Sequence, residues 1–264
     1  MERRNFAQVL KNAKIDIKRE YERLYIIFYE KDTDGASWYD VCERRFLRMP
    51  FKGTYLSLKD FNKCNEFKFE TPPVDFDINC LINFCEYIYN LVARCSDKVH
   101  FERSKFPYPI SQINTLIEKI GYMEIEDDGF FIFVPKSQPA IIVSEMLPPD
   151  ISYKVIEYNH HSMNGDLDRK RSILKLLADQ LESRKDELKG INKQFKEDLF
   201  YMFNTISIRH NNAEKIKAIS ESKLEEWYDY VYELSLLAFM TLENSNHKQF
   251  VLDIKRELGD IQDH

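Results

Sequence analysis

The stretch Leu199-Phe200-Tyr201-Met202-Phe203-Asn204-Thr205-Ile206-Ser207-Ile208-Arg209-His210-Asn211-Asn212 sets an apolar helical stripe directly against a polar end. Apolar residues recur at the i, i+3, i+4 and i+7 spacing of one buried helical face: Phe195, Leu199, Met202, Phe203 and Ile206. The pattern predicts a helix from Asn192 to about Arg209. One turn beyond the stripe, the same face reaches a cation, an imidazole and two amides.

Two interpretations of this polar end stay open. Arg209 and His210 in a last helical turn would complement the negative end of the helix dipole, and asparagine is common just past a helix end. The same groups could instead form a functional site, made of Arg209 and His210 with Asn204, Asn211 and Asn212 in support. The surrounding sequence has to decide between the two.

The composition predicts a mainly α-helical protein. Of 264 residues, 44% are hydrophobic and 31% are charged, while only 7 are glycine, which favours long helices over a β-sandwich or barrel. The formal net charge of −6 argues against a surface that coats nucleic acid throughout. It leaves room for a local basic groove.

Cysteine usage and hydropathy predict a cytoplasmic protein without a membrane segment. The five cysteines include no C-x-x-C pair, and Cys80, Cys85 and Cys95 fall in an apolar helical run, which indicates buried free thiols in a reducing compartment. The amino terminus does not read as a signal peptide. No uninterrupted apolar run reaches the roughly 18 residues of a membrane span. We expect no metal and no cofactor.

Residues 1–150 are predicted to form a helical domain with a small β-hairpin. Helices are expected at 6–29, 37–46, 57–65 and 110–120, and Asp77 should cap a further, strongly apolar helix. The hairpin is Tyr122–Glu126 and Phe130–Val134, joined through Asp127-Asp128-Gly129, because Asp-Gly suits a primed turn. Ala140–Met146 is expected to be extended, and Pro148-Pro149 to mark the domain boundary.

Residues 151–264 are predicted to form an up-and-down bundle of about four helices. Asp166 or Asp168 should start a long helix that Gly190 interrupts. Ser222-Lys223-Leu224-Glu225 fits a capping box at the start of the last long helix. Phosphate-binding glycine loops and metalloprotease motifs are absent from the sequence, and the basic cluster Arg44, Arg45 and Arg48 is a second, weaker candidate for phosphate contact.

Two segments resemble the abortive-infection (AbiJ-type) phage-defence proteins that end in a HEPN domain. The first is Ile113-Asn114-Thr115-Leu116-Ile117-Glu118-Lys119-Ile120-Gly121-Tyr122 with the hairpin and Ile141-Ile142-Val143-Ser144-Glu145-Met146-Leu147. The second is His160-His161-Ser162-Met163-Asn164-Gly165-Asp166, which opens a long helix, followed by the helix that carries Arg209. The resemblance spans about residues 100–240.

The resemblance implies a metal-independent ribonuclease effector of antiviral defence, cytoplasmic and homodimeric, with RNA as substrate and a defence-system protein as a further partner. Arg209 would bind the scissile phosphate, and His210 would act as general acid or base. Asn204, Asn211 and Asn212 would bind the substrate. The site would lie where two subunits meet.

The sequence departs from the family pattern at one point. HEPN motifs place a histidine several residues after the arginine, but the positions four to seven residues after Arg209 are Ala213, Glu214, Lys215 and Ile216. Adjacent side chains on a helix diverge by about 100°, so Arg209 and His210 would face one phosphate only if the helix ends there. The competing hypothesis is a non-catalytic HEPN-like module that dimerises or binds nucleotide or RNA.

Overall fold

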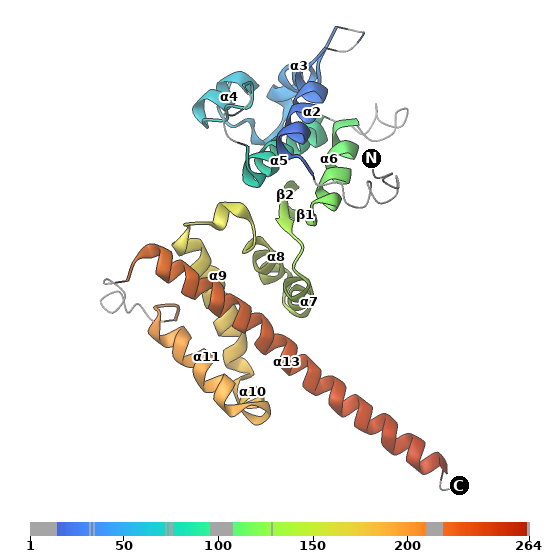
Figure 1. Ribbon diagram of the computed structural model, residues 1–264, viewed down its shortest axis with the longest axis vertical. Coiled ribbons are helices and arrows are strands. Elements are labelled where there is room, and N and C mark those ends of the chain that lie inside the picture. The colour runs from blue at the N-terminus through green and yellow to red at the C-terminus, as the bar shows by residue number, and fades with distance from the viewer. Residues whose placement is uncertain are drawn as a thin grey trace, which may run out of the picture. The chain divides into compact units, whose positions relative to one another are not determined.

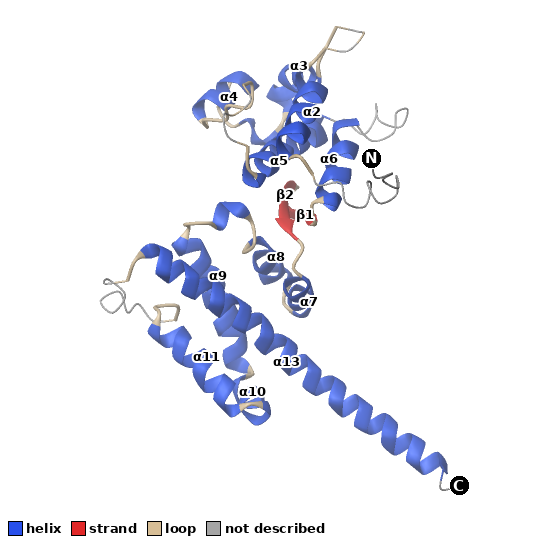
Figure 2. Cartoon of the chain, viewed as in Figure 1, coloured by secondary structure: helices blue, strands red, loops and turns tan. Residues whose placement is uncertain are grey.

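The protein is mainly helical, with one two-stranded β-hairpin, as its composition predicts (Figures 1 and 2). The computed structural model describes residues 15–31, 33, 35–71, 73, 76–95, 108–127, 129–209 and 219–262, without the side chains at 127, 246–249 and 257–262. The chain divides into two compact units, residues 1–133 and 134–264.

The first unit is built around α5 (Ile78–Cys95), whose apolar residues lie in its core. Asp77 caps this helix as predicted, since its carboxylate accepts the backbone N–H of Cys80 at 2.7 Å. The helices around it are α2 (Ile17–Tyr29), α3 (Trp38–Arg45), α4 (Leu58–Cys64) and α6 (Tyr108–Lys119), with short 3₁₀ turns η1 (Phe46–Arg48) and η2 (Pro50–Lys52). The structure confirms the helices predicted at 37–46, 57–65 and 110–120. The helix predicted at 6–29 is present from Ile17 to Tyr29, and residues 6–14 of it lie outside the described residues.

The predicted hairpin is also confirmed, as β1 (Tyr122–Asp127) and β2 (Phe130–Pro135). Gly129 has φ +77°, a backbone conformation that a side chain would strain. The side chain of Asn90 on α5 anchors β2, because its amide donates to the carbonyl of Phe131 and its oxygen accepts the Phe131 N–H, at 2.7 and 2.9 Å. The Asn90 side chain therefore ties β2 to α5.

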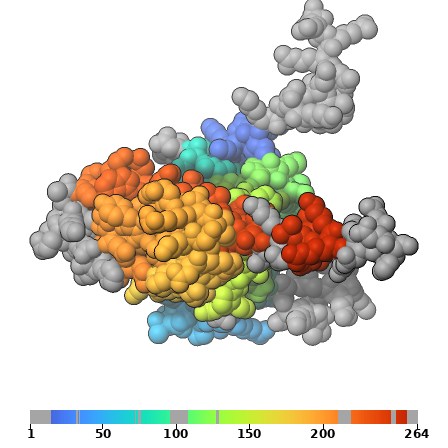
Figure 3. Space-filling view, turned by 90° about the horizontal axis from the view of Figure 1, so that it is seen from below, coloured from blue at the N-terminus to red at the C-terminus, as the bar shows by residue number. Residues whose placement is uncertain are grey.

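The second unit is a helical bundle with its own hydrophobic core. Its helices are α7 (Gln138–Met146), α8 (Pro149–Glu157), α9 (Leu167–Ser183), α10 (Lys185–Ile191), α11 (Lys193–Thr205) and α13 (Glu221–Gln262), with the 3₁₀ turn η4 (His161–Met163). Helices α7, α9, α10 and α11 all contact α13 (Figure 1). Seen from below, α10 and α11 form one continuous surface (Figure 3).

Three sequence predictions for this unit need correction. Ala140–Met146 is helical, because Ser137 caps α7 by accepting the N–H of Ala140 and a proline stands in the first turn. The long helix that begins at Leu167 ends at Ser183, before Gly190, which lies inside α10. The division between the units falls at Phe133 and Val134 and not near 150, since α7 and α8 pack with the bundle.

The start of α13 also differs from the prediction. The helix begins at Glu221, and the backbone carbonyl and hydroxyl of Ser220 accept from Leu224 and Lys223, so Ser222 does not cap it. The beginning of α9 agrees with one of the two predicted caps, because Asp166 accepts the N–H of Arg169 at 3.0 Å. In the described part of the chain, every helix is too short or too polar to cross a lipid bilayer.

Candidate functional site

The polar end of α11 lies on a turn that the helix does not include. Asn192 caps the start of α11. Leu199, Phe203 and Ile206 of the predicted face are buried, and Phe195 and Met202 are partly buried against the same core. The helix ends at Thr205, before the predicted end near Arg209. Ser207 has φ +67°, a left-handed conformation that L-residues seldom adopt. The N–H of Arg209 then bonds the carbonyl of Phe203 at 3.1 Å. This turn releases Arg209 from the helical spacing.

The guanidinium of Arg209 forms an ion pair with Glu182, the penultimate residue of α9. Arg209 Nη1 lies 2.6 Å from Glu182 Oε2, and the arginine side chain is 23% exposed. Lys185 binds the other oxygen of the same carboxylate at 2.5 Å. The hydrogen bond from Lys185, followed by the charge of Arg209, holds the pKa of Glu182 below its usual value of 4.5. The carboxylate of Glu182 therefore forms ion pairs with two cations.

A second arginine fixes the turn from α9. Arg171 Nε donates to the carbonyl of Ser207 at 2.5 Å, and Ser207 itself is buried. The turn thus has arginine contacts on both sides, from Arg171 to its backbone and from Arg209 to Glu182. Its geometry is set by α9 as much as by α11.

Of the predicted site residues, the structure describes Arg209 and Asn204. Asn204 is exposed near the end of α11, and Arg209 lies beyond that end. His210, Asn211 and Asn212 lie outside the described residues. A carboxylate partner of Arg209 within its own chain favours a structural contribution from this arginine; the partner is Glu182 of α9 and neither Glu225 nor Glu226.

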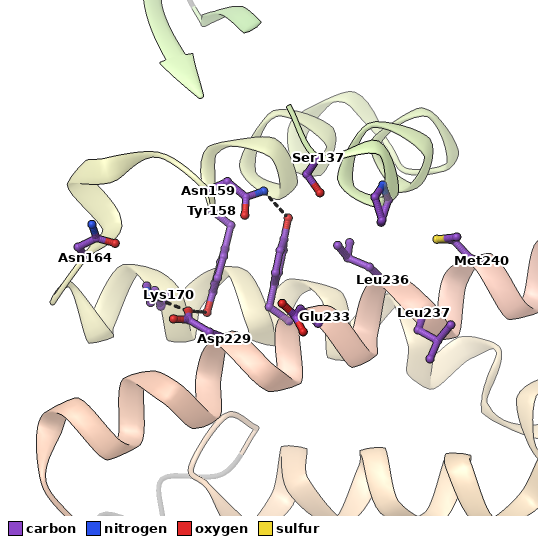
Figure 4. Close-up of a pocket in the computed structure, with 12 residues that line it drawn as sticks. Ser137, Tyr158, Asn159, Asn164, Lys170, Asp229, Glu233, Leu236, Leu237 and Met240 are labelled. Carbon is purple, nitrogen blue, oxygen red and sulfur yellow. Dashed lines mark hydrogen bonds and ion pairs between the residues drawn. The ribbon is translucent and has the colours of Figure 1, made fainter. Parts of the chain in front are cut away.

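A cavity that the sequence did not reveal lies between α7, α8, α9 and α13. Its volume is about 570 Å³, and Figure 4 draws the residues that line it. Polar and apolar side chains line it together: Ser137, Pro139, Tyr158, Asn159, Asn164, Lys170, Asp229, Tyr232, Glu233, Leu236, Leu237 and Met240. A concave site with a few convergent polar groups is the usual form of a ligand pocket.

A buried lysine organises one wall of this cavity. Lys170 Nζ lies 2.7 Å from Asp229 Oδ1 and 2.8 Å from Glu225 Oε1, and its side chain is 4% exposed. The hydroxyl of Tyr158 donates to Asp229 at 2.9 Å, and its burial, with the nearby Asp229 carboxylate, raises the pKa of Tyr158. The N–H of Gly165 and then Lys170 lower the pKa of Glu225. The lysine is therefore satisfied by its own carboxylates.

Two stacked tyrosines separate this network from the apolar wall. The ring centroids of Tyr158 and Tyr232 lie 3.9 Å apart, and the two rings are nearly parallel. The hydroxyl of Tyr232 donates to the carbonyl of Val155 at 2.6 Å and accepts from the amide of Asn159 at 3.2 Å. Both hydroxyls thus have partners, and the pair acts as a rigid wall.

One sequence signal could have pointed to the cavity. Lys170 stands three and four residues before Ile173 and Leu174, on the apolar face of α9. A lysine at a core position requires a buried counter-charge, because an unpaired ammonium is costly to desolvate. The signal was present, but its partners, Glu225 and Asp229, stand far away in the sequence.

Two arginines of the weaker basic candidate, Arg44 and Arg45, bind backbone within the first unit, and the third, Arg48, is exposed at the end of η1. Arg45 donates to the carbonyl of Cys95, and Arg44 Nε donates to the carbonyl of Asp40 at 3.1 Å. These contacts give both arginines a local role at helix ends.

Comparisons with known proteins leave the family of this chain to be argued from its own residues. No family model, no curated protein and no solved structure matches it.

Proposed function

We propose that the second unit is a HEPN-like RNA-binding module in which Arg209 contacts a phosphate of the RNA. The observation that carries this proposal is the placement of Arg209, 23% exposed on a turn beyond α11, with the cations Arg171 and Lys185 beside it. A guanidinium that donates to a carboxylate can present the same N–H groups to a phosphate. Glu182 therefore acts as the resident acceptor that RNA displaces.

The charges around the turn support this assignment. The cations Arg171, Lys185 and Arg209 gather there, against the carboxylates Glu182 and Asp186. This local excess of one positive charge stands in a chain whose net charge is −6. RNA affinity from so small a basic site should fall only gently with salt, because the salt slope is proportional to the number of phosphate contacts and this site offers few.

Binding of a labelled single-stranded RNA, followed by fluorescence anisotropy, tests the proposal. Arg209→Gln should weaken binding about 10-fold, the worth of one hydrogen bond to a charged group. Glu182→Gln should strengthen binding, because the competing carboxylate charge is gone. Arg19→Gln is the matched control, since Arg19 is exposed on α2, in the first unit. Equal affinity of all four proteins would overturn the assignment.

A second candidate function is metal-independent RNA cleavage at the same turn. The end of α11 at Thr205 favours it, because Arg209 then lies beyond the helix that the sequence predicted to carry it. The arginine would neutralise the scissile phosphate, and the histidine would transfer protons. Asn204, Asn211 and Asn212 would then contact the substrate.

Incubation of the purified protein with total RNA in the presence of a chelator separates the two candidates. Cleavage that both Arg209→Ala and His210→Ala abolish supports the ribonuclease, whereas binding without cleavage supports the module alone. Equal cleavage by all three proteins would show a contaminating nuclease.

Homodimerisation and a cytoplasmic location belong to the same proposal. The distal half of α13 extends past the other helices of its unit (Figure 1), and it carries exposed apolar side chains at Phe250, Val251, Leu252 and Ile254. Such side chains suit a second copy of the same helix. Sedimentation equilibrium should give the mass of a dimer for the natural chain and of a monomer for Phe250→Asp/Ile254→Asp. The same mass for both proteins would contradict a dimer formed through this helix.

A further inference from the structure

Two cysteines far apart in the sequence meet in the core of the first unit. Cys42 lies on α3, and Cys95 is the last residue of α5. Their Sγ atoms are 3.1 Å apart, and the residues are 0% and 2% exposed. Both are free thiols. A disulfide bond has a length of about 2.0 Å, so only a small side-chain movement separates this pair from one.

We infer that Cys42 and Cys95 are a modification site, at which a peroxide converts the two thiols into a disulfide that links α3 to the end of α5. One thiol loses its proton, its thiolate attacks a peroxide oxygen, and the O–O bond breaks to give a sulfenic acid and a hydroxide, which takes up that proton as water. The second thiol then attacks that sulfur, the S–O bond breaks and a second water leaves. Two thiols and one hydrogen peroxide give one disulfide and two waters.

The environment of the pair makes this oxidation slow at neutral pH and faster in alkali. The hydrogen bond from Cys95, followed by burial, raises the pKa of Cys42 well above its ordinary value of 9.0. The guanidinium of Arg45 acts in the opposite direction and also holds the carbonyl of Cys95. Because the thiolate is the reacting form, the rate should rise with pH throughout the range up to that pKa.

The link would strengthen the first unit without rearranging it. Helices α3 and α5 already pack against each other, and both sulfur atoms already touch. The cross-link closes a loop between residues 53 apart in sequence, which restricts the unfolded chain far more than the folded one. Oxidation should therefore raise the Tm of this unit.

Peroxide treatment of the full native chain, with mass mapping of its cysteines, tests the inference. The protein is exposed to hydrogen peroxide at pH 7 and pH 9, quenched, denatured, alkylated and digested. We expect a peptide pair joined through Cys42 and Cys95, formed faster at pH 9, and lost after reduction. Free Cys42 and Cys95, at peroxide doses that oxidise the exposed Cys64, would overturn the inference.

Matched variants connect the chemistry to the stability. Cys85→Ser changes a cysteine that is equally buried, and it should keep both the linked peptide and the rise in Tm. Cys42→Ser and Cys95→Ser should each lose both. If a variant does not fold, the mass map of the natural chain still decides the outcome. A Tm that rises without the linked peptide would assign the effect to another oxidation.

Discussion

Lys170 and Asp229 form an ion pair whose two partners lie in very different surroundings. Their Nζ and Oδ1 atoms are 2.7 Å apart, yet the lysine side chain is 4% exposed and the aspartate side chain 50%. Water can solvate the carboxylate if the pair is broken, but it cannot solvate the ammonium. The cost of breaking the pair therefore depends on which partner is removed.

Removal of both carboxylates should destabilise the second unit more than removal of the lysine. Glu225→Gln/Asp229→Asn leaves a buried ammonium without counter-charge and should cost about 3–5 kcal/mol, the range for an unpaired buried charge. Lys170→Met leaves two partly exposed carboxylates and should cost about 1–3 kcal/mol. The chain has two tryptophans, Trp38 and Trp227, so urea unfolding in a Trp38→Phe background reports the second unit. The reverse order of the two variants would contradict this assignment.

Acid should weaken the second unit through Glu225. Its pKa is lowered in the folded state by the N–H of Gly165 and by Lys170, from an ordinary value of 4.5. A lowered folded pKa contributes stability that is complete above 4.5 and is lost as pH falls through the folded value. The urea concentration at the unfolding midpoint should therefore decrease as the pH is lowered below about 4.5, and Glu225→Gln should make this decrease smaller. Glu182→Gln should flatten it as well, for the same reason.

The elements that local sequence signals define were predictable, and those that depend on distant partners were not. The hairpin followed from Asp-Gly between alternating residues, and the start of α5 from Asp77. Ala140–Met146 was predicted wrongly because its apolar residues fit a strand, while the cap at Ser137 and the contact with α13 favour a helix. Ser222 fitted a capping motif, but Ser220 stands at the helix start instead.

Substitution by alanine should change the stability of the second unit in opposite directions at two of its glycines. Gly165 has φ +77°, whereas Gly190 lies within α10, and an added Cβ meets no atom within 4 Å at either position. Gly165→Ala should cost about 1–2 kcal/mol of backbone strain, and Gly190→Ala should stabilise by about 0.5–1 kcal/mol. Thermal unfolding of the two variants checks this pair, and equal effects would contradict the left-handed assignment.

The hydroxyl of Tyr232 should contribute more to the free energy of unfolding than the hydroxyl of an exposed tyrosine. Tyr232→Phe removes the donor to Val155 and the acceptor for Asn159, and it should cost about 1–3 kcal/mol because a buried carbonyl loses its partner. Tyr201→Phe is the control, since Tyr201 is 67% exposed, and it should leave the unfolding midpoint unchanged. If Tyr232→Phe left the unfolding midpoint unchanged, water would have to reach the carbonyl of Val155 and replace the lost hydrogen bond.

The sequence singled out Arg209, but its surroundings could not be read from the pattern. The helical spacing of the apolar residues predicts a helix as far as Arg209, because nothing in the local sequence marks Ser207 as a residue with positive φ. The partner Glu182 lies on another helix, at a separation of 27 residues. The cavity was missed for a related reason, since its lysine and its carboxylates come from different helices.

Because α13 is longer than the bundle it packs in, the amides of its buried first part should exchange more slowly than those of its exposed last part. Near its start, Val231, Phe239 and Leu242 are buried in the bundle, so their amides should exchange with deuterium only when the unit unfolds. Beyond them, Phe250 and Leu252 are 65% and 48% exposed, and amides there should exchange by fraying from residue 262. Pairing with a second copy would slow that fraying, and protection of residues 250–256 would then rise with protein concentration.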